Sequence, residues 1–425
     1  MQVILDRGLE NGDPHRTPFR VLAGAARLDA AELDVEGLLT ARAVYSESRR
    51  PWLEGGFGRF TVGGEEPGDR SWDFVGKAQL GLDLSLTEDL RVFVHGRARY
   101  DGEDSQGDRA GLAEGYLEFH PSLSYSTSLR LRAGLLFPGT SRENVGPLWS
   151  SPYTITLSAL NTWTAEELRI VGLETRLIFE TESNEEFVVG ATAFGFNDPS
   201  GSLVSWRGWS MGDRLMVAGE VLPLPPLASF TPPGGFDPQR DDGTRLIDEL
   251  DDRVGWLGLA RWSRFGKITL QGAYFDNRGD RMLYDLQYSW RTRFGVVGGD
   301  LHLGPDVVVV GEFLWGATGM GAFEKSHVQI DMRAAYALVS WSTSRTRLTV
   351  CYDYFDAVDR DGTEERNDDA GRAWTAALFW NPVEQLRIGL EYVELDADPR
   401  LAAEDSGVDP DTDARRFTVE ARFSF

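Results

Sequence analysis

Apolar and polar residues alternate strictly over many segments of this chain, and this period of two constrains the fold more than any other feature. In the final segment Phe417, Val419 and Phe423 share one face, and Arg416 and Glu420 share the other. Each such segment is about 10 to 14 residues long. Successive side chains of a β-strand point to opposite faces, so the pattern predicts strands with one apolar and one polar face.

Counting the alternating segments gives sixteen strands, an even number, as single-chain bacterial barrels require. The sixteen predicted strands span residues 35–46, 72–86, 89–101, 112–120, 127–138, 167–181, 186–197, 254–263, 266–277, 291–303, 306–318, 327–342, 345–357, 372–381, 384–396 and 414–425. An additional pair made from residues 17–30 and 52–63 would give eighteen strands.

The connections between these segments differ in length from one end of the strands to the other. Short polar turns such as 263–266 and 304–306 alternate with long acidic stretches such as 101–111 and 359–371. Short turns at one end and long loops at the other are typical of outer-membrane barrels. Residues 35–425 are therefore predicted to form an all-β, transmembrane antiparallel β-barrel with short periplasmic turns and long extracellular loops.

Composition excludes several other classes of protein. The formal net charge is -24, which disfavours binding to nucleic acid, because phosphates require Lys and Arg surfaces. The single cysteine, Cys351, and five dispersed histidines predict neither a metal site nor a cofactor site. The sequence holds no apolar run near the roughly 20 residues that a spanning helix needs, but a barrel hides its membrane signal in the alternation.

The amino terminus has features of an export signal. Residues 16–31 combine a basic start, a short apolar centre and small residues at the end, although Arg27 and Asp29 interrupt the centre. Residues 1–34 are interpreted as a degenerate export segment or an N-terminal periplasmic extension.

Aromatic residues fall near the predicted strand ends, where amphipathic rings favour the boundary between lipid and water. These residues form a predicted girdle: Tyr45, Tyr100, Trp262, Trp315, Tyr354, Trp374 and Trp380. Ordinary strand aromatics are the alternative interpretation.

The polar faces of neighbouring strands place charged residues on one sector of the predicted inner wall. The candidate pore-lining residues are Arg91, His95, Arg97, Arg99, Glu114, Glu118, Arg130, Arg132, Glu174 and Arg176. Such a ladder sets the field across a water-filled pore and selects ions. The same charges also neutralise one another across strands and stiffen the wall. Arginines outnumber carboxylates in the ladder, so a mild preference for anions is expected.

Two long loops differ from the acidic ones. Residues 139–165 are poor in charge and rich in Trp, Tyr, Pro and Ser, which favours a loop folded inward to narrow the lumen, with Arg142 and Glu143 as its charged tip. Packing at the barrel mouth or in an oligomer contact is the alternative. Residues 198–253 form the largest loop, which is interpreted as a lid over the mouth.

Two short motifs have simpler explanations than function. Residues 208–212 match the G-x-S-x-G pattern, but no helix pattern follows, so this is interpreted as a chance match. Residues 359–362 faintly resemble the start of a calcium loop but lack the later ligands, and most acidic loops are simply solvated.

Four segments carry a resemblance to a known family. The ending RRFTVEARFSF, with the terminal Phe425, resembles the last strand of outer-membrane proteins. NVGPLWSSPYTITLSALNTW, PWLEGGFGRF and YSWRTRF resemble segments of a proteobacterial family of porins, similar in plan to the general and phosphate-selective sixteen-stranded porins. The resemblance implies a Gram-negative outer-membrane location and recognition of Phe425 by the barrel-assembly machinery. The acidic loops depart from the lysine-rich loops of phosphate-selective porins.

Three functions follow as hypotheses. The first is a passive diffusion channel for small polar or ionic solutes, in contact with outer-membrane lipid and lipopolysaccharide and assembled as a monomer or homotrimer. The second is an adhesin or assembly scaffold with a plugged lumen. The third is a barrel hydrolase that uses Ser210 and His95. An open path past residues 139–165 would separate the first from the second.

Overall fold

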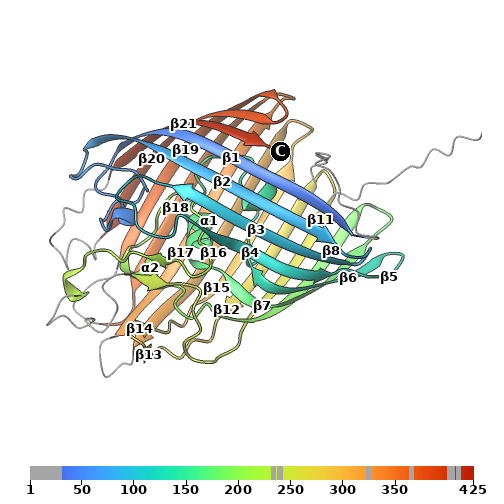
Figure 1. Ribbon diagram of the computed structural model, residues 1–425, viewed down its shortest axis with the longest axis horizontal. Coiled ribbons are helices and arrows are strands. Elements are labelled where there is room, and N and C mark those ends of the chain that lie inside the picture. The colour runs from blue at the N-terminus through green and yellow to red at the C-terminus, as the bar shows by residue number, and fades with distance from the viewer. Residues whose placement is uncertain are drawn as a thin grey trace, which may run out of the picture.

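The computed structural model of the protein describes residues 31–230, 236, 243–321, 327–362, 368–399, 407 and 413–425. They form a closed antiparallel barrel of sixteen strands (Figure 1). The barrel strands are β1 (Glu32–Glu47), β2 (Arg70–Ser85), β3 (Leu90–Tyr100), β4 (Ala110–Phe119), β6 (Thr127–Leu136), β7 (Ile170–Glu180), β8 (Glu185–Gly195), β11 (Gly255–Arg264), β12 (Ile268–Asp276), β15 (Arg293–His302), β16 (Val307–Gly321), β17 (His327–Ser342), β18 (Thr346–Asp359), β19 (Asp369–Val383), β20 (Leu386–Pro399) and β21 (Ala414–Ser424).

The prediction of sixteen strands is confirmed, and the eighteen-stranded alternative is wrong. The first and last strands pair directly, from Leu38 with Ser424 to Glu47 with Arg415, so no further pair can enter between them. Residues 52–63 are not a strand, because they fold as a loop that buries Leu53 and Phe60. Residues 17–30 lie outside the described residues. The first strand begins at Glu32, so residues 32–34 extend the barrel beyond its predicted start.

The short elements lie mainly in the loops. They are the strands β5 (Ser122–Ser124), β9 (Val221–Leu222), β10 (Thr244–Arg245), β13 (Leu283–Tyr284) and β14 (Gln287–Tyr288), the helices α1 (Ala159–Glu167) and α2 (Ser202–Trp206), and the 3-10 turns Trp52–Glu54, Pro147–Trp149 and Ala228–Phe230. Among the described residues, no helix has the length and apolar character needed to cross a membrane.

The outer face of the barrel exposes large apolar side chains. Its exposed aromatics include the predicted girdle residues Tyr100, Trp315, Tyr354, Trp374 and Trp380. Tyr45 packs on Trp72 of the neighbouring strand with ring centroids 5.0 Å apart. A soluble protein rarely exposes so continuous an apolar surface, so this face is suited to lipid.

The first strand and the last residue of the chain meet in one close contact. The Phe425 amide donates to the Gly37 carbonyl over 3.1 Å, and the Gly37 amide donates back over 2.8 Å. The Phe425 ring occupies the space in which a Cβ atom of residue 37 would lie. Glycine at this position therefore lets the tip of the terminal ring lie against the first strand.

We predict that Gly37→Val displaces the Phe425 ring and destabilises barrel closure by about 1–3 kcal/mol, the usual cost of overpacking. The measurement is the temperature of the folded-to-unfolded gel shift in detergent. Gly258→Val is the matched control, because Gly258 also lies on a strand and a Cβ there meets its nearest neighbour at 3.7 Å. Equal transition temperatures for the two variants would contradict the role of this contact.

Candidate functional site

The third long loop, residues 137–169, runs through the interior of the barrel. Gln271 on β12 donates to the carbonyl of Gly139 over 3.1 Å. Glu391 on β20 accepts from the amide of Thr156 over 2.9 Å, and Asp353 on β18 accepts from the first amide of α1 over 3.1 Å. Because these strands lie on different parts of the wall, the loop spans the lumen (Figure 1).

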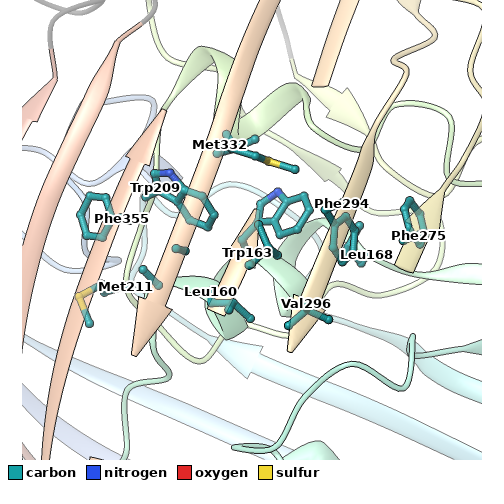
Figure 2. Close-up of a cluster of buried hydrophobic side chains, with 14 of the residues drawn as sticks. Leu160, Trp163, Leu168, Trp209, Met211, Phe275, Phe294, Val296, Met332 and Phe355 are labelled. Carbon is teal, nitrogen blue, oxygen red and sulfur yellow. The ribbon is translucent and has the colours of Figure 1, made fainter. Parts of the chain in front are cut away.

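Apolar contacts hold α1 against one side of this interior. Figure 2 shows Leu160 and Trp163 of α1 beside Phe294 and Val296 of β15, with Met332 of β17 close by. The rings of Trp163 and Phe294 meet edge to face, with centroids 5.3 Å apart. The expectation of a polar inner face therefore fails on this side of the barrel, because an inward loop needs an apolar surface to pack on.

The predicted charged tip of the third loop is fixed by partners. Arg142 forms an ion pair with Asp300 on β15. Glu143 is 1% exposed and accepts from the Ser158 hydroxyl over 2.6 Å and from the Asn161 amide over 3.0 Å. Burial raises the pKa of Glu143 to about 8 against these hydrogen bonds. Arg142 thus ties the loop to the wall, and Glu143 supports the loop from within.

The fourth long loop, residues 196–254, also enters the barrel instead of only covering its mouth. In its stretch 208–220, the carbonyl of Gly212 accepts from the amide of Leu157 over 2.9 Å, and the amide of Met216 donates to the carbonyl of Ala165 over 3.0 Å. Trp209 packs against Trp163 with ring centroids 6.0 Å apart. We call residues 208–220 the inserted segment.

The inserted segment covers the upper residues of the predicted arginine ladder. Arg97 is 2% exposed and pairs with Glu220 over 3.1 Å, and Arg99 is 6% exposed and pairs with Asp213 over 2.7 Å. His95 is fully buried beside them. The structure therefore places these three predicted pore-lining residues under a loop that shields them from most of the solvent.

The lower residues of the ladder remain open. The side chains of Arg91, Arg130 and Arg132 are 23%, 16% and 17% exposed, whereas their shared partner Glu118 is 2% exposed. Arg176 is 11% exposed and pairs with Glu174 over 2.6 Å. We call Arg91, Arg130, Arg132 and Arg176 the arginine wall. The carboxylates of Glu118 and Glu174 are less exposed than the arginines that pair with them, whereas Asp83, which also pairs with Arg91 over 2.7 Å, is 26% exposed.

Glu114 differs from the other carboxylates of the ladder in its hydrogen-bond partner. Its carboxylate accepts from the amide of Phe137, where the third loop leaves its strand, over 3.4 Å. The structure thus gives this predicted pore-lining residue a contact with the loop.

Three charged residues that pack with the buried part of the ladder were not predicted from the sequence: Arg42, Lys77 and Asp213. Arg42 and Lys77 lie on the polar faces of predicted strands, so the same face rule finds them. Asp213 ends a Trp-rich stretch of the fourth loop, and no local signal marks its position. Its pairing with Arg99 joins residues 114 apart in sequence.

The motif at residues 208–212 has a structural explanation. The Ser210 hydroxyl donates to Glu166 over 2.9 Å, and Glu166 pairs with Arg207 over 2.9 Å. Ser210 is buried and follows a helix, whereas a nucleophile elbow precedes one. Through these contacts Ser210 helps to hold the inserted segment in place.

The fourth loop contains one carboxylate cluster within the described residues. The oxygens of Asp198, Glu249 and Asp251 lie within 4.8 Å of one another. Burial raises the pKa of Asp198 to about 7, and the neighbouring carboxylates add to this effect. Amides of Leu250 and Asp251 donate to Asp198, so the cluster organises the loop. Asp359 and Asp361 hydrogen-bond locally, and residues 363–367 of the suggested calcium loop lie outside the described residues.

Comparison with known proteins identifies the fold. The chain is similar to the outer membrane channel DcaP of Acinetobacter baumannii, with 12% identity, a TM-score of 0.57, and coverage of 95% of this chain and 100% of that one. An anion-selective porin from Comamonas acidovorans has 10% identity, a TM-score of 0.51, and coverage of 93% and 100%. A trimer form of OmpT, an outer membrane protein of Vibrio cholerae, has 13% identity, a TM-score of 0.53, and coverage of 93% and 100%.

No family model and no curated protein sequence matches the chain. The fold is nevertheless that of the sixteen-stranded outer-membrane porins, which confirms the predicted architecture.

We predict that Glu143 makes stability depend on pH. Its folded-state pKa of about 8 lies above the ordinary value of 4.5, so the folded protein keeps a proton that the unfolded chain releases in this window. The free energy of unfolding therefore falls as the pH rises from 4.5 towards 8, and this contribution is constant above that range. Glu143→Gln should flatten the decline of Tm between about pH 5 and pH 8.

Glu182→Gln, in an exposed turn, is the control and should keep the wild-type slope. Identical slopes in wild type and Glu143→Gln would mean that Glu143 is ionised in the folded protein.

Proposed function

We propose that this protein is a channel of the Gram-negative outer membrane for passive diffusion of small polar or ionic solutes. The observation that carries the proposal is the arginine wall, a set of partly exposed charges inside a closed barrel whose outer face is apolar. Sixteen-stranded barrels have room for a water-filled passage. Diffusion needs no nucleophile, cofactor or energy source, only a wet lumen with an electric field.

The arginine wall supports a preference for anions. Glu118 is almost covered by the arginines that it neutralises, so around Glu118 a passing solute meets Arg91, Arg130 and Arg132, with Asp83 as the exposed carboxylate beside Arg91. A low-dielectric wall focuses such a field into the lumen. The acidic loops at the mouth act in the opposite direction, but their charges are screened within about 8 Å at physiological salt. Anion preference should therefore be clearest at high salt and weaken at low salt.

The filled upper lumen favours a second candidate, an adhesin or assembly scaffold with a permanent plug. The third loop and the inserted segment bury Arg97 and Arg99 and pack α1 against the wall. A scaffold of this kind never conducts. Discrete conductance steps of the purified protein in a planar bilayer support the channel and contradict the scaffold.

The hydrolase hypothesis has less support, because Ser210 is engaged with Glu166.

The proposed partners follow from the surface. The apolar outer face fits outer-membrane lipid and lipopolysaccharide, and the terminal Phe425 strand fits recognition by the barrel-assembly machinery. A depression of about 600 Å³ on the outer face is lined by Ala41, Ala78, Ala98 and Ala421 together with larger side chains such as Tyr100 and Phe423. Small residues let neighbouring backbones approach closely in a membrane. We propose that this face joins copies of the chain in a homotrimer.

We predict that replacing Arg130, Arg132 and Arg176 with glutamine lowers the anion-to-cation permeability ratio by about threefold, because the lumen loses its exposed cations. The measurement is the reversal potential in a salt gradient. The control replaces Arg333, Arg372 and Arg415, which are more than half exposed near the long-loop ends of their strands, and should leave the ratio unchanged. An unchanged ratio in the wall variant would mean that selectivity is set elsewhere.

We predict that Ala98→Trp converts the homotrimer to monomers, since an indole would fill the small-residue depression. Light scattering in detergent measures the change. Ala260→Trp, on the exposed face of β11, is the control and should remain trimeric. A wild-type protein that is monomeric under the same conditions would contradict the trimer proposal.

A further inference from the structure

One carboxylate of the fourth loop is bound by three cations from three adjacent strands. Arg42 on β1 donates to both oxygens of Asp213, over 2.9 and 2.8 Å. Lys77 on β2 donates over 2.6 Å and Arg99 on β3 over 2.7 Å. We call Arg42, Lys77 and Arg99 the cation cradle. A planar carboxylate held by a two-pronged guanidinium and two further cations is the geometry of a carboxylate-binding site.

The barrel strands supply little negative charge to the cation cradle. Arg42 has a strand partner, Glu420, at 2.8 Å. In the described part of the chain, the carboxylates that pair with Lys77 and Arg99 are Asp213 and Asp101, which lie in loops outside the strands. Removing the inserted segment would therefore leave a positively charged site on a rigid sheet.

Asp213 is an anion in this setting. Burial alone would raise the pKa of its carboxyl, but Arg42, Arg99 and Lys77 hold it well below the ordinary range. The cradle is also not sealed: the side chains of Asp213 and Lys77 are 9% and 6% exposed. A cavity of about 20 Å³, lined in part by Arg42, Arg99 and Asp213, lies alongside, which is room for about one water molecule.

We propose that the cation cradle is a binding site for the carboxylate group of a small organic acid, and that Asp213 occupies it as a tethered competitor. A solute carboxylate that enters the cradle takes over the ion pairs of Asp213. The three cations stay neutralised throughout, so the exchange avoids leaving a buried charge unpaired. Displacement of Asp213 frees the inserted segment from Arg42, Lys77 and Arg99, whereas Arg97 on β3 still binds Glu220 and the Leu215 carbonyl.

Release of the segment links binding to permeation. Glu220 holds the same segment through Arg97, above the arginine wall. When the part of the segment around Asp213 moves, it uncovers Arg99 above the arginine wall and extends the cationic path along β3. This consequence rests on the channel function proposed above, whereas binding to the cradle does not.

The test measures binding of succinate to the full-length protein in detergent by calorimetry, with chloride and phosphate at matched ionic strength. Asp213→Asn keeps the shape of the side chain and removes its charge, so succinate should bind on the order of tenfold more tightly than to wild type. Adding Arg99→Gln should abolish the gain. Glu220→Gln is the matched control, because it loosens the same segment without vacating the cradle, and it should bind as wild type does.

A second measurement needs no variant. Trp209 is buried between Trp163 and Phe355, so release of the segment in the wild-type protein should shift tryptophan emission to longer wavelength with succinate but not with chloride. Equal succinate binding by wild type and Asp213→Asn, or equal responses to succinate, phosphate and chloride, would overturn the proposal. A conducting barrel with no succinate binding rejects the cradle alone, and succinate binding without conductance rejects the channel alone.

Discussion

Backbone hydrogen bonding in a membrane is the constraint on which the rest of this structure depends. Hydrocarbon offers no partner for an N–H or C=O group, so a sheet in lipid must close on itself. Pairing of β1 with β21 achieves this closure. Closure fixes which side chains face lipid and which face the lumen, and the number of strands fixes how wide that lumen is. The remaining question for such a chain is what fills the lumen.

Two loops fill it, and different forces hold them. The helix α1 is buried along its whole length and rests on Phe294, Val296 and Met332, so moving it would expose a large apolar surface to water. On the opposite side, ion pairs of Asp213 and Glu220 hold the inserted segment to the strands, and its buried side chains, such as Trp209 and Met216, add apolar contacts. Charged groups that lose an ion pair can form new hydrogen bonds with water, whereas apolar side chains exposed to water gain no comparable interaction.

How well each feature could be predicted from the sequence depends on how far apart its interacting residues lie along the chain. The strands could be predicted because the period of two is local, and the inward course of residues 139–165 could be predicted because their composition does not suit a solvated loop. On β17, Met332 and Leu338 point inward while Val339 and Trp341 point outward, so apolar residues on both faces concealed the apolar inner wall. The burial of Arg99 depends on Asp213, and a sequence pattern cannot reveal a contact between residues so far apart.

The contrast between the two loops determines which of them can respond to a solute. A small anion cannot replace the apolar contacts of α1, so the third loop is a fixed constriction whatever enters the barrel. The same anion can replace the Asp213 carboxylate, because it restores the charge pairs of Arg42, Lys77 and Arg99 when the loop leaves. The arginine wall lies nearer the short turns, on strands β3, β6 and β7, where in the proposed channel its field raises the local concentration of anions. In the proposed channel, the third loop thus sets the size of the lumen, whereas the arginine wall and the cation cradle recognise charge.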